Sequence, residues 1–309
     1  MDSNKYLIIG GSTKCGTTSV FKYFEFHPDV CPCIMKESRF FWNNDYFLEA
    51  ASRDHTKYSA FSDLFQNCEH KKLRLEATPD YLYSAATAHK IKAELTNCKF
   101  VFILRDPIDR LISWFKFARL NGLIDKQLSF EEYIKQQKDD SSGKMPQHMR
   151  ALSQGKYYEF LRSYIEIFGP ENILVTFYED LSKNPSAFCN QICEFGKIDT
   201  IYFKNYDFKI FNPSVATRSV GIHQLFRKFK RTIRPVTRKF NYSLRKKIKS
   251  AGYKFETAFM SANKDQSDEM DMKNSDSMLE TLRKYYISDV EKIKSITGKT
   301  PPWRNFYNE

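Results

Sequence analysis

A lysine and several small residues follow the first apolar segment of the chain. Residues 6–9 are apolar and lead into the sequence GGSTKCGTTS. Glycine and small hydroxyl residues between a strand and a helix form a loop whose backbone N–H groups bind anions, and the helix N-terminus adds roughly half a positive charge. The sequence therefore predicts a phosphate-binding loop. The residues expected to bind the anion are Lys14, Cys15, Gly16, Thr17 and Thr18.

The loop departs from the nucleoside-triphosphate motif GxxxxGK[ST] at its lysine. Gly11 and Gly16 have the spacing of that motif, but Thr17 occupies the position of its lysine, and Lys14 lies earlier in the loop. A nucleotide kinase also needs an Asp at a strand end to hold magnesium, a role for which the sequence offers Asp106. A P-loop nucleotide or small-molecule kinase is therefore kept as an alternative function.

Apolar and amphipathic segments alternate along the whole chain. We expect buried strands and helices in turn, and a helix that begins at Ser129 with a capping box to Glu132. This order predicts a single α/β domain over residues 1–309, with a P-loop-like three-layer architecture in which helices flank a central parallel sheet. Ligands of such sheets bind at the carboxyl ends of the strands, where the lysine loop lies. The expected strands are 6–9, 30–34, 73–77, 99–104 and 172–178, and the expected helices are 17–26, 86–95, 108–120, 157–168, 185–195 and 279–296.

The loop and the residues after it resemble sulfotransferases that use 3′-phosphoadenosine-5′-phosphosulfate (PAPS), and most closely the heparan-sulfate and related carbohydrate branch. The similarity runs through KCGTTS, then HPDV at 27–30, then KESRFF at 36–41. A second segment, FILRDPIDRLIS at 102–113, is similar to the family's strand followed by R-D-P-x-x-R-x-x-S. Weaker fragments at 155–157, 173–181 and 212–218 extend the resemblance over nearly the whole chain.

The resemblance implies a donor site for PAPS, with adenosine 3′,5′-bisphosphate as product and no metal. The loop would hold the phosphosulfate, Arg105 and Ser113 the 3′-phosphate, and Arg218 would close over that phosphate. An arginine at a strand end offers a fork of donors suited to a phosphate. Asp106 and Asp109 are alternatively capping acids of the helix after Arg105, and Arg110 a solvated residue on it, so these three are left out of the predicted site.

The resemblance also implies an in-line displacement in which Glu37 is the base for an acceptor hydroxyl or amine and Lys14 stabilises the leaving phosphate. Glu76 is a second candidate base. The chain departs from its relatives on the acceptor side, because Arg39 stands where they often have His and Ala77 where they often have Lys. Arg39 is an alternative site for an acidic acceptor, and Glu37 an alternative ion-pair partner of Lys36 or Arg39.

The positive charge of the chain is concentrated in one segment. Residues 217–255 contain thirteen Lys or Arg and no Asp or Glu, and removing them from the total of 49 basic residues leaves 36 against 37 acidic ones. Such a segment favours a polyanionic partner, an anionic saccharide or a membrane surface, or forms solvated basic helices. With the resemblance, it favours a saccharide acceptor, and no nucleic acid is expected. A polyanion-binding protein without catalysis is a further alternative.

Seven cysteines without a zinc-binding pattern indicate reduced thiols in a cytosol-like compartment. Cys31 and Cys33 are an alternative reactive pair. The apolar segments are strand-length, far from the roughly 20 residues of a membrane span, so a cytoplasmic protein is expected. Residues 264–277, rich in Ser, Asn and acidic residues, are expected to form a mobile loop.

Overall fold

The computed structural model describes residues 5–42, 58–138, 145–209 and 276–307. The basic segment 217–255, including Arg218, lies outside the described residues, as do residues 264–275 of the predicted loop. Residues 276 and 277 belong to the helix α10 (Asp276–Thr297), so the predicted loop extended too far at its C-terminal end.

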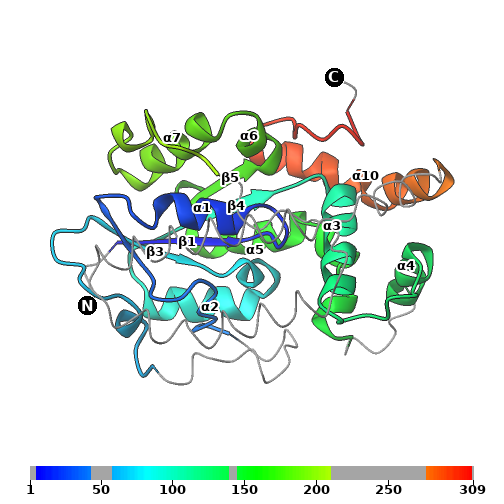
Figure 1. Ribbon diagram of the computed structural model, residues 1–309, viewed down its shortest axis with the longest axis horizontal. Helices are drawn as coiled ribbons and strands as arrows, with labels where there is room; N and C mark the ends of the chain where they lie inside the picture. The colour runs from blue at the N-terminus through cyan, green and yellow to red at the C-terminus, as the bar shows by residue number, and fades with distance from the viewer. Residues whose placement is uncertain (1–4, 43–57, 139–144, 210–275, 308–309) are drawn as a thin grey trace.

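Five strands form one parallel sheet, as predicted (Figure 1). Their order in the sheet is β2-β3-β1-β4-β5, so β1 lies at the centre and the chain moves to either side of it. A sheet with this order has a topological switch point beside its central strand, where ligands bind. The strands are β1 (Tyr6–Gly11), β2 (Val30–Pro32), β3 (Leu73–Ala77), β4 (Cys98–Leu104) and β5 (Ile173–Phe177).

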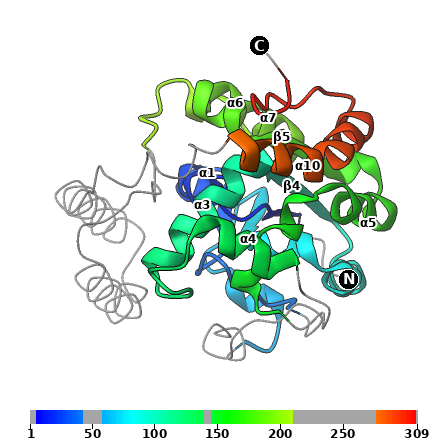
Figure 2. The ribbon, with the colours of Figure 1, turned by 90° about the vertical axis from the view of Figure 1, so that its right-hand side faces the viewer.

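Side chains of the central strand alternate between two hydrophobic cores. Tyr6 and Ile8 belong to one cluster, and Leu7 and Ile9 to the other, because successive side chains of a strand point to opposite faces. Both faces are covered by helices, which confirms the three-layer α/β architecture (Figures 1 and 2). The face of Leu7 is covered by α1 (Thr17–Phe24) and α7 (Pro185–Gly196), and the face of Ile8 by α2 (Ala85–Glu94), α3 (Pro107–Leu120), α5 (Tyr158–Phe168) and α10.

Two helices begin as the sequence predicted. The side chain of Asp106 caps α3 by accepting hydrogen bonds from the backbone N–H groups of Ile108 and Asp109. Ser129 and Glu132 form the capping box of α4 (Phe130–Lys138): the hydroxyl and backbone N–H of Ser129 donate to the Glu132 carboxylate, and the N–H of Glu132 donates to the Ser129 hydroxyl. The short helix α6 (Tyr178–Lys183) follows β5 directly.

Arg110 is fully buried, so the interpretation of it as a solvated residue was wrong. Its guanidinium donates to the backbone carbonyl of Ala151 and lies within electrostatic reach of Tyr83, Tyr157 and Tyr286. A buried charge is tolerated only where polar groups surround it. These partners come from distant parts of the chain, so the periodicity of α3 could not reveal them.

The prediction that all cysteines are reduced was wrong for one pair. Cys31 on β2 forms a disulfide with Cys68, and the other five cysteines are free and buried. The expected alternative pairing of Cys31 with Cys33 is not formed. The bond ties β2, the edge strand that leads to Glu37, to the segment before β3.

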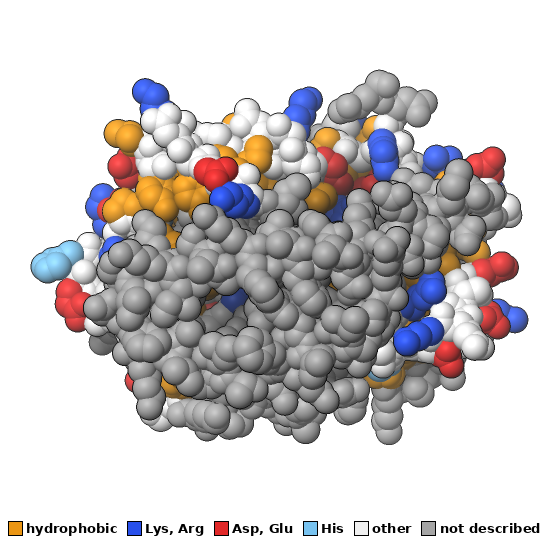
Figure 3. Space-filling model, viewed as in Figure 1, with side chains coloured by type: hydrophobic (Ala, Val, Ile, Leu, Met, Phe, Trp, Pro, Cys, Tyr) orange, Lys and Arg blue, Asp and Glu red, His pale blue; other side chains and the backbone are white. Residues whose placement is uncertain are grey.

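Basic and acidic side chains are interspersed on the described surface shown in Figure 3. This mixture agrees with the near balance of charge outside residues 217–255. None of the helices in the described ranges combines the length and the hydropathy of a membrane span.

We expect the Cys31–Cys68 bond to stabilise the fold. Its loss in Cys68→Ser removes a constraint on the unfolded chain across a separation of 37 residues, which is worth about 2–4 kcal/mol of unfolding free energy. Urea unfolding with and without dithiothreitol measures this difference. The reductant should lower the midpoint of the wild type and leave that of Cys68→Ser unchanged; an equal midpoint for the wild type in both conditions would contradict the bond.

Candidate active site

The predicted lysine loop lies at the carboxyl end of the central strand β1 and leads into α1. Its backbone turns sharply, with a φ of 67° at Lys14 and 78° at Gly16, both in the left-handed region. A Cβ atom at residue 16 would lie 2.8 Å from the Leu181 side chain and 3.1 Å from the Tyr178 ring, so conformation and space both favour glycine there. The loop thus packs closely against α6. Its lysine lies at the switch point of the sheet.

Tyr83 supports the start of this loop from the short 3-10 helix η4 (Pro79–Tyr83). Its hydroxyl lies 2.7 Å from Ser12 Oγ and 3.1 Å from Thr13 Oγ1, and it accepts a hydrogen bond of 3.3 Å from the Thr13 backbone N–H. All of these groups are buried. The loop is therefore fixed before any ligand binds, which lowers the entropic cost of binding.

Lys14 is half-buried and lies against an aromatic ring. Its ammonium is 4.5 Å from the centroid of Phe117 on α3, a cation–π contact. Burial, and then the neighbouring positive charge of Arg105, lower the pKa of Lys14 to about 8. The ammonium is therefore still mostly protonated at pH 7, and an anion bound beside it would favour the charged form.

The structure brings Arg105, at the end of β4, to the same loop. Its guanidinium donates a hydrogen bond of 3.4 Å to the backbone carbonyl of Lys14 and lies 4.6 Å from the centroid of the Tyr178 ring. Ser113 is buried on α3, one turn before Phe117 and therefore on the same side of the helix. Lys14, Arg105 and the helix that carries Ser113 thus meet at one end of the sheet.

Lys14 on the loop and Arg105 beside it form no direct ion pair with a carboxylate in the ranges that the structure describes. Glu37 lies within electrostatic reach of Lys14, and Glu179 within electrostatic reach of Arg105. Cations that are partly removed from water bind anions strongly, and an arginine suits the paired oxygens of a phosphate. These residues fit an anionic ligand such as a phosphate.

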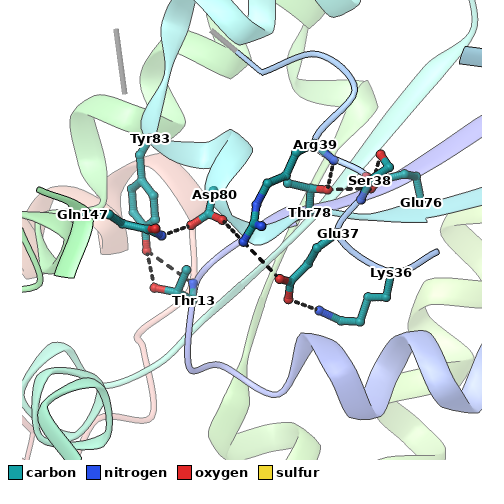
Figure 4. A network of polar contacts seen from close by, with 10 residues as sticks. All are labelled: Thr13, Lys36, Glu37, Ser38, Arg39, Glu76, Thr78, Asp80, Tyr83 and Gln147. Carbon is teal, nitrogen blue, oxygen red and sulfur yellow. Dashed lines mark hydrogen bonds and ion pairs between the residues drawn. The ribbon is translucent and has the colours of Figure 1, made fainter. Parts of the chain in front are cut away.

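Glu37 lies at the same end of the sheet, beyond β2. Its backbone N–H donates to the carbonyl of Ala77 at 2.9 Å, which continues the pairing of this segment with β3. Its carboxylate forms ion pairs of 2.6 Å with Lys36 Nζ and 3.3 Å with Arg39 Nη2 (Figure 4). The alternative that Glu37 forms an ion pair with Lys36 or Arg39 is therefore confirmed, since it pairs with both. The Glu37 side chain is still 36% exposed and lies within electrostatic reach of Lys14.

Glu76, the second candidate base, is fully buried at the end of β3. One of its oxygens accepts hydrogen bonds from the backbone N–H and hydroxyl of Ser38, at 3.2 and 2.9 Å, and from the Thr78 hydroxyl at 2.6 Å. Burial raises its pKa to about 7 although these hydrogen bonds oppose the shift. A carboxyl without exposed surface is better placed to hold the turn around Ser38 than to meet an acceptor.

Several residues that build this site were not predicted from the sequence. Tyr83, Phe117, Tyr178 and Asp80 make their contacts with residues far away in the chain. Of these four, only Asp80 could have been recognised from the sequence around it. It is the one acidic residue in the aromatic segment PDYLY, and a carboxylate in a buried segment needs a partner.

Comparisons with known proteins agree with the geometry. A family model described as "Sulfotransferase domain" matches residues 4–216. The membrane-associated sulfotransferase kil1 of Dictyostelium discoideum is 30% identical over 136 residues, which is 43% of this chain and 28% of that protein. A bifunctional heparan sulfate N-deacetylase/N-sulfotransferase of Drosophila melanogaster is 24% identical over 212 residues, which is 64% of this chain and 20% of that protein. The chain thus spans less than a third of the length of these relatives.

A solved structure shares the fold over nearly the whole chain. The sulfotransferase from Alicyclobacillus acidocaldarius superposes with a TM-score of 0.66 over 97% of both chains, at 18% sequence identity. The P-loop-like three-layer architecture predicted from the order of strands and helices is therefore confirmed.

Removing the Tyr83 hydroxyl should loosen the loop and weaken anion binding. In Tyr83→Phe the buried groups of Ser12 and Thr13 lose a partner, at a cost of about 1–3 kcal/mol in unfolding free energy. Urea unfolding and calorimetric titration with adenosine 3′,5′-bisphosphate measure the two effects.

Tyr164→Phe is the matched control for this change. It also removes a buried hydrogen bond to η4, of 2.6 Å to the Tyr81 carbonyl, but does not touch the loop. We expect it to lower stability and leave bisphosphate affinity unchanged. Equal affinities for the wild type and Tyr83→Phe would refute the supporting role of Tyr83.

Proposed function

The chain belongs to the sulfotransferase domain family, and we propose that it transfers a sulfuryl group from PAPS to an acceptor hydroxyl or amine. The observation that carries this proposal is the pair of cations, Lys14 and Arg105, that meet at the loop after β1 and form no direct ion pair with a carboxylate among the described residues. The donor has phosphate groups at two positions of its nucleoside, and two cations from different elements would bind them.

On the donor side, the loop residues Lys14, Cys15, Gly16, Thr17 and Thr18 would hold the 5′-phosphosulfate. Lys14 would neutralise the charge that develops on the bridging oxygen and the departing phosphate, the point where stabilisation lowers the barrier most. Arg105 and Ser113 would bind the 3′-phosphate. Arg218 stays a proposed part of this subsite and lies outside the described residues.

On the acceptor side, Glu37 would remove the proton from the attacking hydroxyl or amine. The acceptor atom forms a bond to sulfur as the bond from sulfur to the bridging oxygen breaks, and the proton passes to the carboxylate of Glu37. Glu37 suits this role better than Glu76, because its carboxylate is partly exposed while Glu76 is fully buried. A general base of this kind contributes about 10²–10⁴-fold to a rate.

We propose a saccharide as the acceptor, and the similarity to the heparan sulfate N-deacetylase/N-sulfotransferase of Drosophila melanogaster supports this class. The basic segment 217–255 would favour an anionic saccharide or bring the chain to an anionic membrane surface.

The cytoplasmic location expected from the sequence stays a prediction. The Cys31–Cys68 bond argues for a more oxidising compartment.

Adenosine 3′,5′-bisphosphate should raise the melting temperature of the protein, and ATP with Mg²⁺ should not. A ligand at about 100 times its Kd stabilises the folded state by about 2.7 kcal/mol. Lys14→Ala should abolish this shift, while the control Lys126→Ala, at an exposed position away from the loop, should retain it. Stabilisation by ATP and Mg²⁺ alone would favour a kinase. If the wild type and Lys14→Ala bind heparin with equal affinity, and the bisphosphate does not change the melting temperature, a polyanion-binding protein would be favoured.

Glu37→Gln should abolish transfer and leave donor binding intact, since the amide cannot accept the proton but keeps the size of the side chain. Transfer from ³⁵S-labelled PAPS is measured with a neutral disaccharide, cellobiose, and with an anionic amino-polysaccharide, N-deacetylated heparosan. Glu159→Gln, at an exposed ion pair on α5, is the control and should behave as the wild type. Loss of bisphosphate binding in Glu37→Gln would assign Glu37 a structural role, and wild-type transfer to neither sugar would refute a saccharide acceptor of these classes.

A further inference from the structure

A chain of charged side chains links Glu37 to the interior of the protein. The Nη2 atom of Arg39 lies 3.3 Å from Glu37 Oε2 and 3.4 Å from Asp80 Oδ2, so one nitrogen is shared between the two carboxylates (Figure 4). The exposure of these side chains falls along the chain, from 36% for Glu37 to 18% for Arg39 and 2% for Asp80. Arg39 therefore connects a partly exposed carboxylate to a buried one.

Asp80 is held firmly at the inner end of this chain. Its Oδ1 atom accepts a hydrogen bond of 2.6 Å from Gln147 Nε2, and its Oδ2 atom faces Arg39. Burial raises the pKa of Asp80 to about 6, and the positive charge of Arg39 opposes that shift. Asp80 is therefore mostly ionised at neutral pH and attracts the guanidinium of Arg39.

The turn that carries Glu37 and Arg39 is unusual for residues with side chains. Glu37 has a φ of 62° and Arg39 a φ of 52°, a conformation that costs free energy in any residue but glycine. Ser38, between them, points inward and is fixed by Glu76, while the backbone N–H of Arg39 donates to Thr78 Oγ1 at 3.3 Å. The turn thus sends the side chains of Glu37 and Arg39 toward each other, as Figure 4 shows.

The 3-10 helix η4 connects this chain to the lysine loop. Asp80 and Tyr83 both lie on η4: Asp80 contacts Arg39, and Tyr83 contacts Ser12 and Thr13. One short and buried element therefore holds both the loop proposed to bind the donor and the partner of the proposed base. Its rigidity would fix the position of Glu37 relative to the phosphosulfate.

We infer that Asp80 is a positioning residue of the reaction, which acts through Arg39 to hold the Glu37 carboxylate toward the acceptor. This inference rests on the proposed function of Glu37. In this inference Arg39 holds the proposed base Glu37, rather than binding an anionic group of the acceptor. A displacement of about 1 Å in a catalytic group is enough to slow a reaction by about 100-fold.

The test uses Asp80→Asn in the full-length protein, which keeps the size of the side chain and removes its charge. Turnover of ³⁵S-labelled PAPS is measured as the sum of transfer to N-deacetylated heparosan and hydrolysis. We expect the kcat of this turnover to fall about tenfold or more. The KM for PAPS and the Kd for adenosine 3′,5′-bisphosphate should stay at the wild-type values, because the lysine loop is untouched. Asp63→Asn on the 3-10 helix η3 (Phe61–Leu64), whose carboxylate is exposed, is the matched control and should keep the wild-type kcat.

The route through Arg39 is tested by a double-mutant cycle. If Asp80 acts only by holding Arg39, Asp80→Asn should have no further effect on kcat in an Arg39→Gln background, so the two losses should not add. Additive losses would show that Asp80 acts by another route and would overturn the inference. So would a simultaneous loss of kcat and of bisphosphate affinity in Asp80→Asn, which would assign Asp80 a general structural role.

Crystal structures of the wild type and Asp80→Asn with adenosine 3′,5′-bisphosphate test the same point without any turnover. We expect Arg39 to bridge the two carboxylates in the wild type and to turn away from Glu37 in the variant. Unchanged positions of both side chains in the variant would overturn the inference. A wild type that neither binds the bisphosphate nor turns over PAPS would instead refute the proposed function, and the crystal comparison would still decide the role of Asp80.

Discussion

Two positive charges are held close together at the end of the central strand. Burial lowers the pKa of Lys14, and the charge of Arg105 lowers it further to about 8, yet the ammonium is still mostly charged at neutral pH. Like charges in such an arrangement repel, and a protein retains them only where surrounding groups compensate. The ring of Phe117 beside Lys14 and the ring of Tyr178 beside Arg105 supply part of that compensation through their π-electrons. Glu37, within electrostatic reach of Lys14, and Glu179, within electrostatic reach of Arg105, supply more of it, and the anion that we propose for this site would supply the remainder.

The elements around the loop place these groups from several directions. β1 ends between β3 and β4, which brings Arg105 and the lysine loop to the same edge of the sheet. η4 supports the loop through Tyr83, while α3 provides Phe117. Arg110 is buried beneath them near Tyr83 and Tyr157, and the hydroxyl of Tyr157 donates to the Arg105 carbonyl at 2.9 Å. The Arg105 carbonyl and the side chains of the lysine loop are thus each held by a tyrosine hydroxyl that lies within electrostatic reach of the Arg110 guanidinium.

The sequence was sufficient for features that depend on neighbouring residues. Apolar segments such as residues 99–104 predicted the strands, Ser129 and Glu132 predicted a helix start, and the displaced Lys14 separated this loop from that of nucleotide kinases. Features that depend on distant residues were missed or misjudged. The charge of Arg110 suggested solvent although its tyrosine partners lie on other elements, and Cys31 pairs with Cys68 although nothing in their spacing marks them. Helical periodicity gives the direction of a side chain but not the polar groups that make its burial possible.

The acceptor side follows a different electrostatic principle from the donor side. Lys14 and Arg105 form no direct ion pair with a carboxylate in the described residues, whereas Lys36 and Arg39 are matched by Glu37 and Asp80. A carboxylate close to a multiply charged anion would be repelled by it, and at short range in a partly dry site this repulsion amounts to several kcal/mol. The ion pairs of Glu37 with Lys36 and Arg39 would offset this repulsion and would hold the proposed base where an acceptor can reach it. Arg39 carries a permanent positive charge, and the buried carboxylate of Asp80 provides its counter-charge from inside the fold.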